Sequence, residues 1–192
     1  DLRMNIDSSV ASAAEIEFLR DGVEQGAIEY ITNDDIANSY LRVKAGSNFG
    51  LKMNASGHVT MPYQPGFRAY RNQTAWVVSG TFVFDQTEYN VGGHYSTSTG
   101  RFTAPITGVY HFDFYTIQQG DITNGAIKVL VNGARPWGGD VHFSPNSGTP
   151  WDFVSWHSDY KLNAGDYLEI TSNQSHTYHG KNWSSFSGHL VG

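Results

Sequence analysis

The chain has 192 residues, with 39% hydrophobic and only 16% charged side chains, and it contains no cysteine. Its formal charge of −6 is spread without long basic runs, which argues against nucleic acid or an acidic membrane as a partner. The lack of cysteine excludes disulfides and thiolate metal sites. Glycine, serine, threonine, asparagine and tyrosine are plentiful, a profile typical of an all-β protein with many turns.

The N-terminal region gives few signals of its own. Residues 1–13 are small and polar and lack a periodic apolar face, so we expect an N-terminal arm. No signal peptide is visible and residue 1 is Asp, which predicts a fragment of a longer protein or a processed product. No apolar run approaches the roughly 20 residues that a membrane helix needs.

Residues 14–64 carry five short runs in which apolar and polar side chains alternate, separated by turn signals. Strands this short and narrow are marginal alone in water. We therefore expect identical chains to wrap around one another as a β-structured fibre shaft, with an ordinary small β domain followed by a linker as the alternative. The residues expected at this subunit contact are Ile16, Phe18, Ile28, Leu41 and Val43.

A domain boundary is expected near Pro62 and Pro65, because two prolines withdraw two ladder donors. Residues 65–192 then form a second domain. Its clearest strand runs from Gly108 to Gln118, where Tyr110, Phe112 and Phe114 share one face and His111, Asp113 and Tyr115 the other. In the remaining segments the residues expected to face the core are Val77, Phe82, Phe84, Ile127, Val129, Val131, Val154, Trp156, Tyr160, Leu168 and Ile170.

Three further segments are interpreted from their turn residues. Asn132-Gly133 is a strong tight-turn signal, and residues 133–150, rich in glycine and proline, predict long loops. Residues 173–183 are polar and aromatic and are also interpreted as a loop.

One set of spacings is specific. Phe84, Asn90, Tyr95, Phe102, Gly108, Tyr110, Phe112 and Phe114 follow one another with five, four, six, five, one, one and one residues between them. This order resembles the signature of the globular head of complement component 1q, whose superfamily includes tumour necrosis factor. Residues 186–190 and 162–166 are similar to that family's last strand and penultimate turn. The resemblance implies a jelly-roll sandwich of about ten strands that assembles as a homotrimer.

The junction between the two segments carries a second, shorter resemblance. Residues 54–67 are similar to the segment that precedes such heads in bacteriophage tail fibres. Some relatives of the head hold calcium near the three-fold axis, but no acidic cluster here matches such a site. A structural ion on that axis is therefore not expected, and no cofactor is expected either.

Tryptophan, tyrosine and histidine gather near the C-terminus, on segments interpreted as loops. Flat rings beside amide and hydroxyl donors suit a recognition surface for a glycan or a protein, although rings packed beneath their own loops or at subunit contacts are an equal alternative. The candidate ligand contacts are Trp137, Trp151, His176, Tyr178, His179 and Trp183.

Catalytic and metal signals are weak. His176 and His179 form an H-x-x-H pair without a third ligand at a fixed spacing, so surface histidines are favoured over a metal site. His111 and Asp113 lack a nucleophile in a G-x-S-x-G setting, and with Tyr115 they are expected at a subunit contact rather than in a catalytic triad. The carboxylates are scattered, which disfavours glycoside cleavage.

The interpretation that follows is a homotrimeric phage tail fibre: an arm (1–13), a β-rich shaft (14–64) and a complement-1q-like head (65–192). It would sit on the virion tail, be extracellular when free, and attach the remainder of the virion to a host-surface glycan or protein without catalysis. One alternative is a surface-polysaccharide depolymerase of a phage tail. Another is a secreted complement-1q-like recognition protein, although residues 1–66 lack the Gly-X-Y repeats of a collagen stalk.

Overall fold

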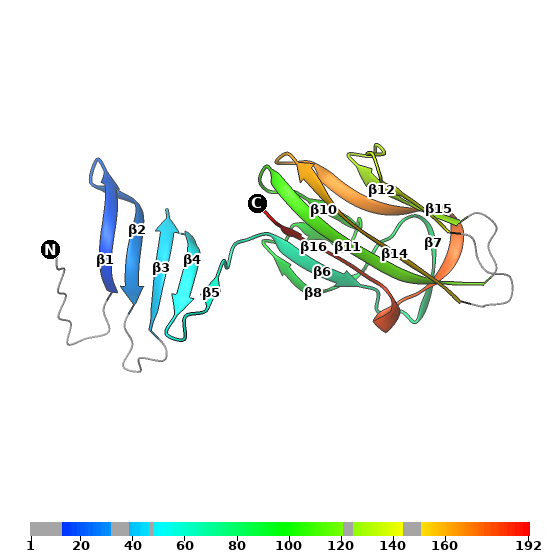
Figure 1. The fold of residues 1–192 in the computed structure, drawn as a ribbon, viewed down its shortest axis with the longest axis horizontal. Coiled ribbons are helices and arrows are strands. Elements are labelled where there is room, and N and C mark those ends of the chain that lie inside the picture. The colour runs from blue at the N-terminus through cyan, green and yellow to red at the C-terminus, as the bar shows by residue number, and fades with distance from the viewer. Residues whose placement is uncertain (1–12, 32–38, 47, 121–124, 144–150) are drawn as a thin grey trace. The chain divides into compact units, whose positions relative to one another are not determined.

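The computed structural model describes residues 13–31, 39–46, 48–120, 125–143 and 151–192. The chain folds as two compact units that divide between Gln64 and Pro65 (Figure 1). The expected N-terminal arm lies outside the described residues, except for residue 13. Within the described part, no helix is long and apolar enough to cross a membrane.

The first unit is a single antiparallel sheet whose strands pair in chain order. Its five members match the five alternating runs predicted for this region. They are β1 (Ala13–Arg20), β2 (Val23–Ile31), β3 (Tyr40–Ala45), β4 (Asn48–Asn54) and β5 (Val59–Thr60). The chain reverses between β1 and β2 through Asp21 and Gly22, which both have positive φ as a tight hairpin turn requires.

The second unit contains only strands and one short 3-10 helix in its described residues, which confirms the predicted all-β class. The elements are β6 (Gly66–Tyr70), β7 (Ala75–Thr81), β8 (Gln86–Val91), β9 (Tyr95–Ser96), β10 (Arg101–Thr103), β11 (Gly108–Gln119), β12 (Gly125–Val131), β13 (Asp140–Phe143), β14 (Trp151–Leu162), β15 (Tyr167–His179), η2 (Lys181–Trp183) and β16 (Ser185–Leu190).

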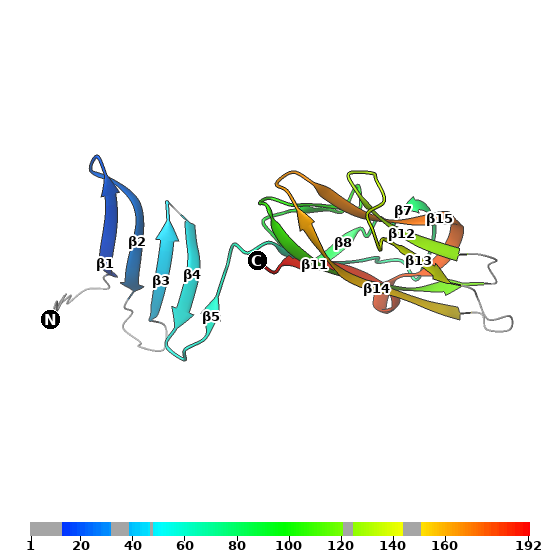
Figure 2. The same ribbon diagram turned by 45° about the horizontal axis from the view of Figure 1, so that its top comes forward.

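These strands form two layers that pack face to face (Figure 2). One layer, called here the β11 layer, has the order β14-β11-β16-β6-β8. In the other, β15 pairs with β12, β7 and β10, and β13 pairs with β12. The last residues of β15 also pair with the last residues of β11, which joins the layers at one end.

The core between the layers is aromatic, and it explains the spacing signature. Phe67 stacks on Tyr95 and Phe102 with ring centroids 4.8 and 5.2 Å apart. The Asn90 side chain holds the turn before Tyr95 by donating to the Tyr95 carbonyl and accepting from its N–H, at 2.8 and 3.1 Å. Tyr110, Phe112 and Phe114 are buried as predicted, and so are Phe82, Phe84, Trp156, Leu168 and Ile170.

Three local predictions are wrong. Val77 is exposed, because the pairing of Trp76 with Tyr178 turns Trp76 and Val78 inward instead. Residues 173–179 continue β15 rather than forming a loop, since β7 pairs with them beyond a bulge between Ser172 and His176. The loop predicted over 133–150 contains strand β13, although the tight turn at Asn132-Gly133 is confirmed by positive φ at both residues.

Candidate functional site

The second unit has two ends, which are defined by the strand termini that meet at each of them. At one end the Leu190 N–H donates to the Pro65 carbonyl, so the start of the unit and its last strand lie together with Gly108 and Leu162. This is called here the tethered end. The far end, called the distal end, is where Gln119 pairs with Trp151 and with Thr177. The 12 residues of β11 separate the ends, which corresponds to about 40 Å at the rise of an extended strand.

A hollow of about 400 Å³ opens at the distal end and is lined by Ile117, Trp151, His179 and Trp183. Strand register places the first three together. Ile117 pairs with Phe153 on one side and with His179 on the other, and Trp151 is two residues before Phe153 on the same face. The hollow is called here the aromatic hollow, and it lies on the outer face of the β11 layer.

Ring contacts fix the walls of the aromatic hollow. The Trp151 and His179 rings lie with centroids 4.2 Å apart and planes tilted by 58°. Both ring nitrogens of His179 are buried and have no hydrogen-bond partner among the described residues. Trp151 and Trp183 each leave about half of their surface exposed, at 47% and 55%. The hollow therefore offers flat rings and an alkyl side chain, and its lining contains no lysine, arginine or carboxylate.

Trp183 reaches this place because of a tight approach at Gly180. A Cβ at Gly180 would lie 2.0 Å from the Gln73 carbonyl oxygen, so only glycine allows the backbone to pass there. The Lys181 N–H then donates to the Arg71 carbonyl at 2.6 Å, and η2 follows directly. Lys181 itself has a φ of +47°, a backbone conformation that costs energy for a residue with a side chain.

A second, polar hollow of about 580 Å³ borders the first across η2. Arg68 and Glu88 form an ion pair at its rim, and the Ser184 hydroxyl lies buried beside it with no partner among the described residues. The whole lining consists of Arg68, Tyr70, Asn72, Glu88, Tyr115, Lys181, Asn182 and Ser184. Apolar rings and polar donors thus lie next to each other at the distal end.

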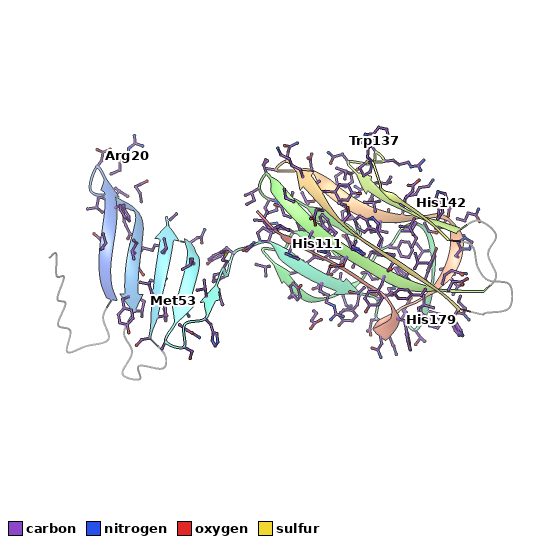
Figure 3. The ribbon with its side chains drawn as sticks, viewed as in Figure 1. Arg20, Met53, His111, Trp137, His142 and His179 are labelled. Atoms are coloured by element: carbon purple, nitrogen blue, oxygen red, sulfur yellow. The ribbon has the colours of Figure 1, made fainter. Side chains whose placement is uncertain are left out.

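The structure brings together only three of the six candidate ligand contacts: Trp151, His179 and Trp183. Trp137 is 98% exposed but belongs to the β12–β13 turn, beside a separate hollow of about 390 Å³. That turn follows the pairing of Val131 with Leu168, close to the tethered end, and Figure 3 shows Trp137 far from His179.

Two of the six candidates must be corrected. Tyr178 is fully buried against Phe82 and bonded to the Ser172 hydroxyl, so it cannot contact a ligand. His176 points inward on the same side of β15, where burial lowers its pKa. Because His176 and His179 are three apart on a strand, their side chains lie on opposite faces and cannot share a metal. No metal-ligating group of three residues occurs in the part of the chain that is described.

The comparisons with known proteins fit this architecture. Residues 66–191 match the C1q domain. The chain belongs to the C1q family. It is 30% identical over 111 residues to complement C1q tumor necrosis factor-related protein 3 of Mus musculus and likewise to that of Homo sapiens, with 57% of this chain and 44% of each relative covered. The chain thus spans less than half the length of these curated relatives.

Solved structures support the fold at lower identity. The globular domain of zebrafish complement 1qA protein is 20% identical with a TM-score of 0.55, covering 67% of this chain and 98% of that chain. Eiger TNF from S. frugiperda is 13% identical with a TM-score of 0.56, covering 67% of this chain and 93% of that chain. The jelly-roll prediction is therefore confirmed.

Membership of the C1q family also bears on chemistry, because C1q domains are non-enzymatic. The prediction of a non-catalytic head is confirmed on that ground for residues 66–191. A depolymerase gains no support, and His111 and Asp113 of β11 need a different explanation.

Those residues form a polar cluster in the middle of the β11 layer's outer face. His111 Nδ1 lies 2.6 Å from Asp159 Oδ1 and its Nε2 lies 3.1 Å from Asp113 Oδ2. The hydrogen bond to Asp159, with help from the Asp113 charge, raises the pKa of His111. The His189 ring lies 5.5 Å away. His111, Asp113 and Tyr115 thus share one face, and their role at a subunit contact stays a prediction.

Ile117 is the member of the aromatic hollow that the sequence did not single out. The alternation that puts His111, Asp113 and Tyr115 outward also puts Ile117 outward, so the exposed position of Ile117 could have been predicted from the sequence. That Ile117 and Trp183 line the same hollow depends on the path of β15 and η2, which no spacing in the sequence indicates.

Proposed function

We propose that this chain carries the recognition head of an extracellular homotrimeric protein, which binds a cell-surface glycan or protein through its distal end without catalysis. The aromatic hollow is the observation that carries this proposal. C1q domains typically form homotrimers, and C1q-family proteins are secreted or extracellular. These family traits support a homotrimer and an extracellular location, and the aromatic hollow is the proposed ligand site.

The position of the hollow supports its role. A head is held by the chain that enters it, so the end opposite that entry is the one a large target can reach. Trp151 and Trp183 are half-exposed at this end, and tryptophan is enriched among the residues that dominate binding energy. Three weak sites on one trimer would gain 10²–10⁴-fold in apparent affinity on a surface dense in ligand.

A phage tail fibre is the second candidate, and one observation favours it. The unit before Pro65 is an antiparallel β-sheet, which suits the shaft of a fibre, and residues 1–66 contain no collagen-like Gly-X-Y repeats. In this candidate the same distal end would meet a bacterial surface. The two candidates share the recognition site and differ only in what presents it.

The test is binding of labelled full-length chain to an array of immobilised glycans, to intact bacteria and to intact animal cells. Replacing both Trp151 and Trp183 by Ala should lower binding by about 10²–10³-fold, because each anchor contributes on the order of 2 kcal/mol. Trp137→Ala is the matched control, since this exposed ring lies outside the hollow and its loss should change binding less than twofold.

Equal binding by the double variant and the native chain, with the trimer intact, would remove the hollow from the account. Loss of the trimer in that variant would instead assign both rings to a subunit contact. Binding to bacteria alone favours the tail fibre, whereas binding to animal cells favours a secreted recognition protein.

A further inference from the structure

The N-terminal sheet carries two rows of apolar side chains on one face, whereas its charged residues Glu29, Arg42, Lys44 and Lys52 lie on the other face. Register aligns Ile16, Ile28, Val43 and Leu51 in one row across four strands. A second row on the same face runs through Tyr30, Leu41, Met53 and Val59. Each row crosses the strands along the hydrogen-bond direction, so the face carries two continuous apolar stripes.

This apolar face is uncovered in the single chain. Ile16, Ile28, Tyr30, Val43 and Val59 are all exposed, and Val43 on the central strand β3 keeps 43% of its surface in contact with solvent. Met53, labelled in Figure 3, lies on the neighbouring strand β4. A single sheet with one apolar face needs a second layer to cover that face, because burial of apolar side chains is the main source of its stability.

The opposite face of the sheet carries charged side chains that pair with one another. Glu29 is almost fully buried there beneath Arg42 and Lys44, which both pair with its carboxylate. Lys44 also pairs with Glu24 at 2.8 Å, and the Lys52 ammonium lies 3.8 Å from the Tyr40 ring centroid. Only the apolar face is therefore left without a partner among the described residues of this unit.

The size of the apolar face indicates what could cover it. Four strands of six to nine residues and one of two residues, about 4.8 Å apart, present on the order of 500 Å² in projection. Three such faces together would remove on the order of 1,500 Å² from water, which exceeds the roughly 1,000 Å² that a specific interface needs. The two rows contain no charged side chain, which suits a copy of the same surface.

We propose that the apolar face of the N-terminal sheet packs against the same face of two other copies, so that three sheets close into a three-sided β-prism around an apolar axis. Three copies are inferred because C1q domains typically form homotrimers and each head is joined to one sheet. The central strand β3 then lies nearest the axis, with Val43 at the closest approach between copies. The unit acts as a second trimerisation module, outside the residues that match the C1q domain.

The absence of native cysteine allows a direct test in the full-length chain, because one introduced thiol is unique. Val43→Cys is a small and apolar change on the buried axis, whereas Lys52→Cys places the thiol on the polar face of the adjacent strand. Each variant is treated with a three-armed maleimide at low protein concentration and resolved on a denaturing gel. Val43→Cys should give covalent trimers, and Lys52→Cys should give single modified chains.

Sedimentation of the same samples distinguishes the proposed prism of N-terminal sheets from the proposed trimer of the whole chain. A trimeric chain in which Val43→Cys reacts but stays uncrosslinked would overturn the prism and leave trimerisation to the head alone. A monomeric chain would overturn the prism and the proposed trimer together. Equal crosslinking of both variants would also contradict the proposal, since only one face is assigned to the axis.

Discussion

The His111 imidazole lies between the carboxylates of Asp113 and Asp159 on the outer face of the β11 layer. Its pKa is raised by the hydrogen bond to Asp159 and by Asp113, so the native state favours the protonated ring. A raised pKa means that the stability from this cluster is fully present below the ordinary value of 6.5 and is lost as the pH rises through the native value. The His189 ring lies beside His111, and His157 pairs with Asp113 on the neighbouring strand.

Asp159→Asn should therefore lower the pKa of His111, because it removes the largest cause of the shift. An NMR titration of the histidine ring protons, with the signal assigned by His111→Gln, measures the change. Glu88→Gln serves as the control, since Glu88 lies on the same layer but pairs with Arg68. An unchanged pKa of His111 in the Asp159 variant would contradict the hydrogen bond as its cause.

Whether a core residue could be predicted from the sequence depended on its immediate neighbours. Alternation was sufficient for Tyr110, Phe112 and Phe114, because polar residues separate the three rings and fix the inward side. It was insufficient at Trp76, Val77 and Val78, where three apolar residues follow one another. There the partner strand decides, and the pairing with β15 turns Val77 outward.

At the scale of strands, β15 shows why the site was only partly predictable. Residues 173–179 are polar and suggest a loop, yet their backbone groups pair with β7 and then with β11. This pairing places His179 beside Ile117 and Trp151, whose own strand begins 28 residues earlier in the sequence. Such long-range pairing is set by tertiary contacts, so composition alone predicted the aromatic residues but not which of them would meet.

Strand pairing in the N-terminal sheet leads to a prediction about Glu29. Burial opposes ionisation of this carboxylate, but hydrogen bonds from Lys44 and Arg42 outweigh it and keep the pKa of Glu29 below its ordinary value. Glu29→Gln should lower the free energy of unfolding of the sheet by about 1.5–3 kcal/mol, the range for hydrogen bonds to charged groups. For the native chain the same contribution should fade as the pH falls through the lowered pKa.

Two signals separate the sheet from the head in that measurement. All five tryptophans lie between residues 76 and 183, so tryptophan fluorescence follows the head alone, while far-ultraviolet circular dichroism follows both units. In urea at one protein concentration, the variant should shift the circular dichroism transition and leave the fluorescence transition in place. Glu17→Gln, an exposed residue on the same sheet, should change neither, and a matching shift in fluorescence would contradict the assignment.

At the scale of the whole molecule, the proposed trimer has two contact faces, one on the head and one on the N-terminal sheet. The outer face of the β11 layer carries the cluster around His111 and Tyr115, and the sheet carries its apolar stripes. Two contacts in series on one chain reinforce each other, because the first association brings the second pair of surfaces to a high effective concentration. A trimer held at both levels should therefore resist dilution better than one held at the head alone.

Removing residues 1–64 tests this coupling. Sedimentation should give the full-length chain a mass three times 21.2 kDa, and the 65–192 fragment should also be trimeric at high concentration. On dilution the fragment should dissociate at a concentration about tenfold higher or more, because the surface that the sheets bury against one another is lost. Identical dissociation of the two would leave the sheet without a part in assembly, and a full-length monomer would contradict trimerisation at both levels.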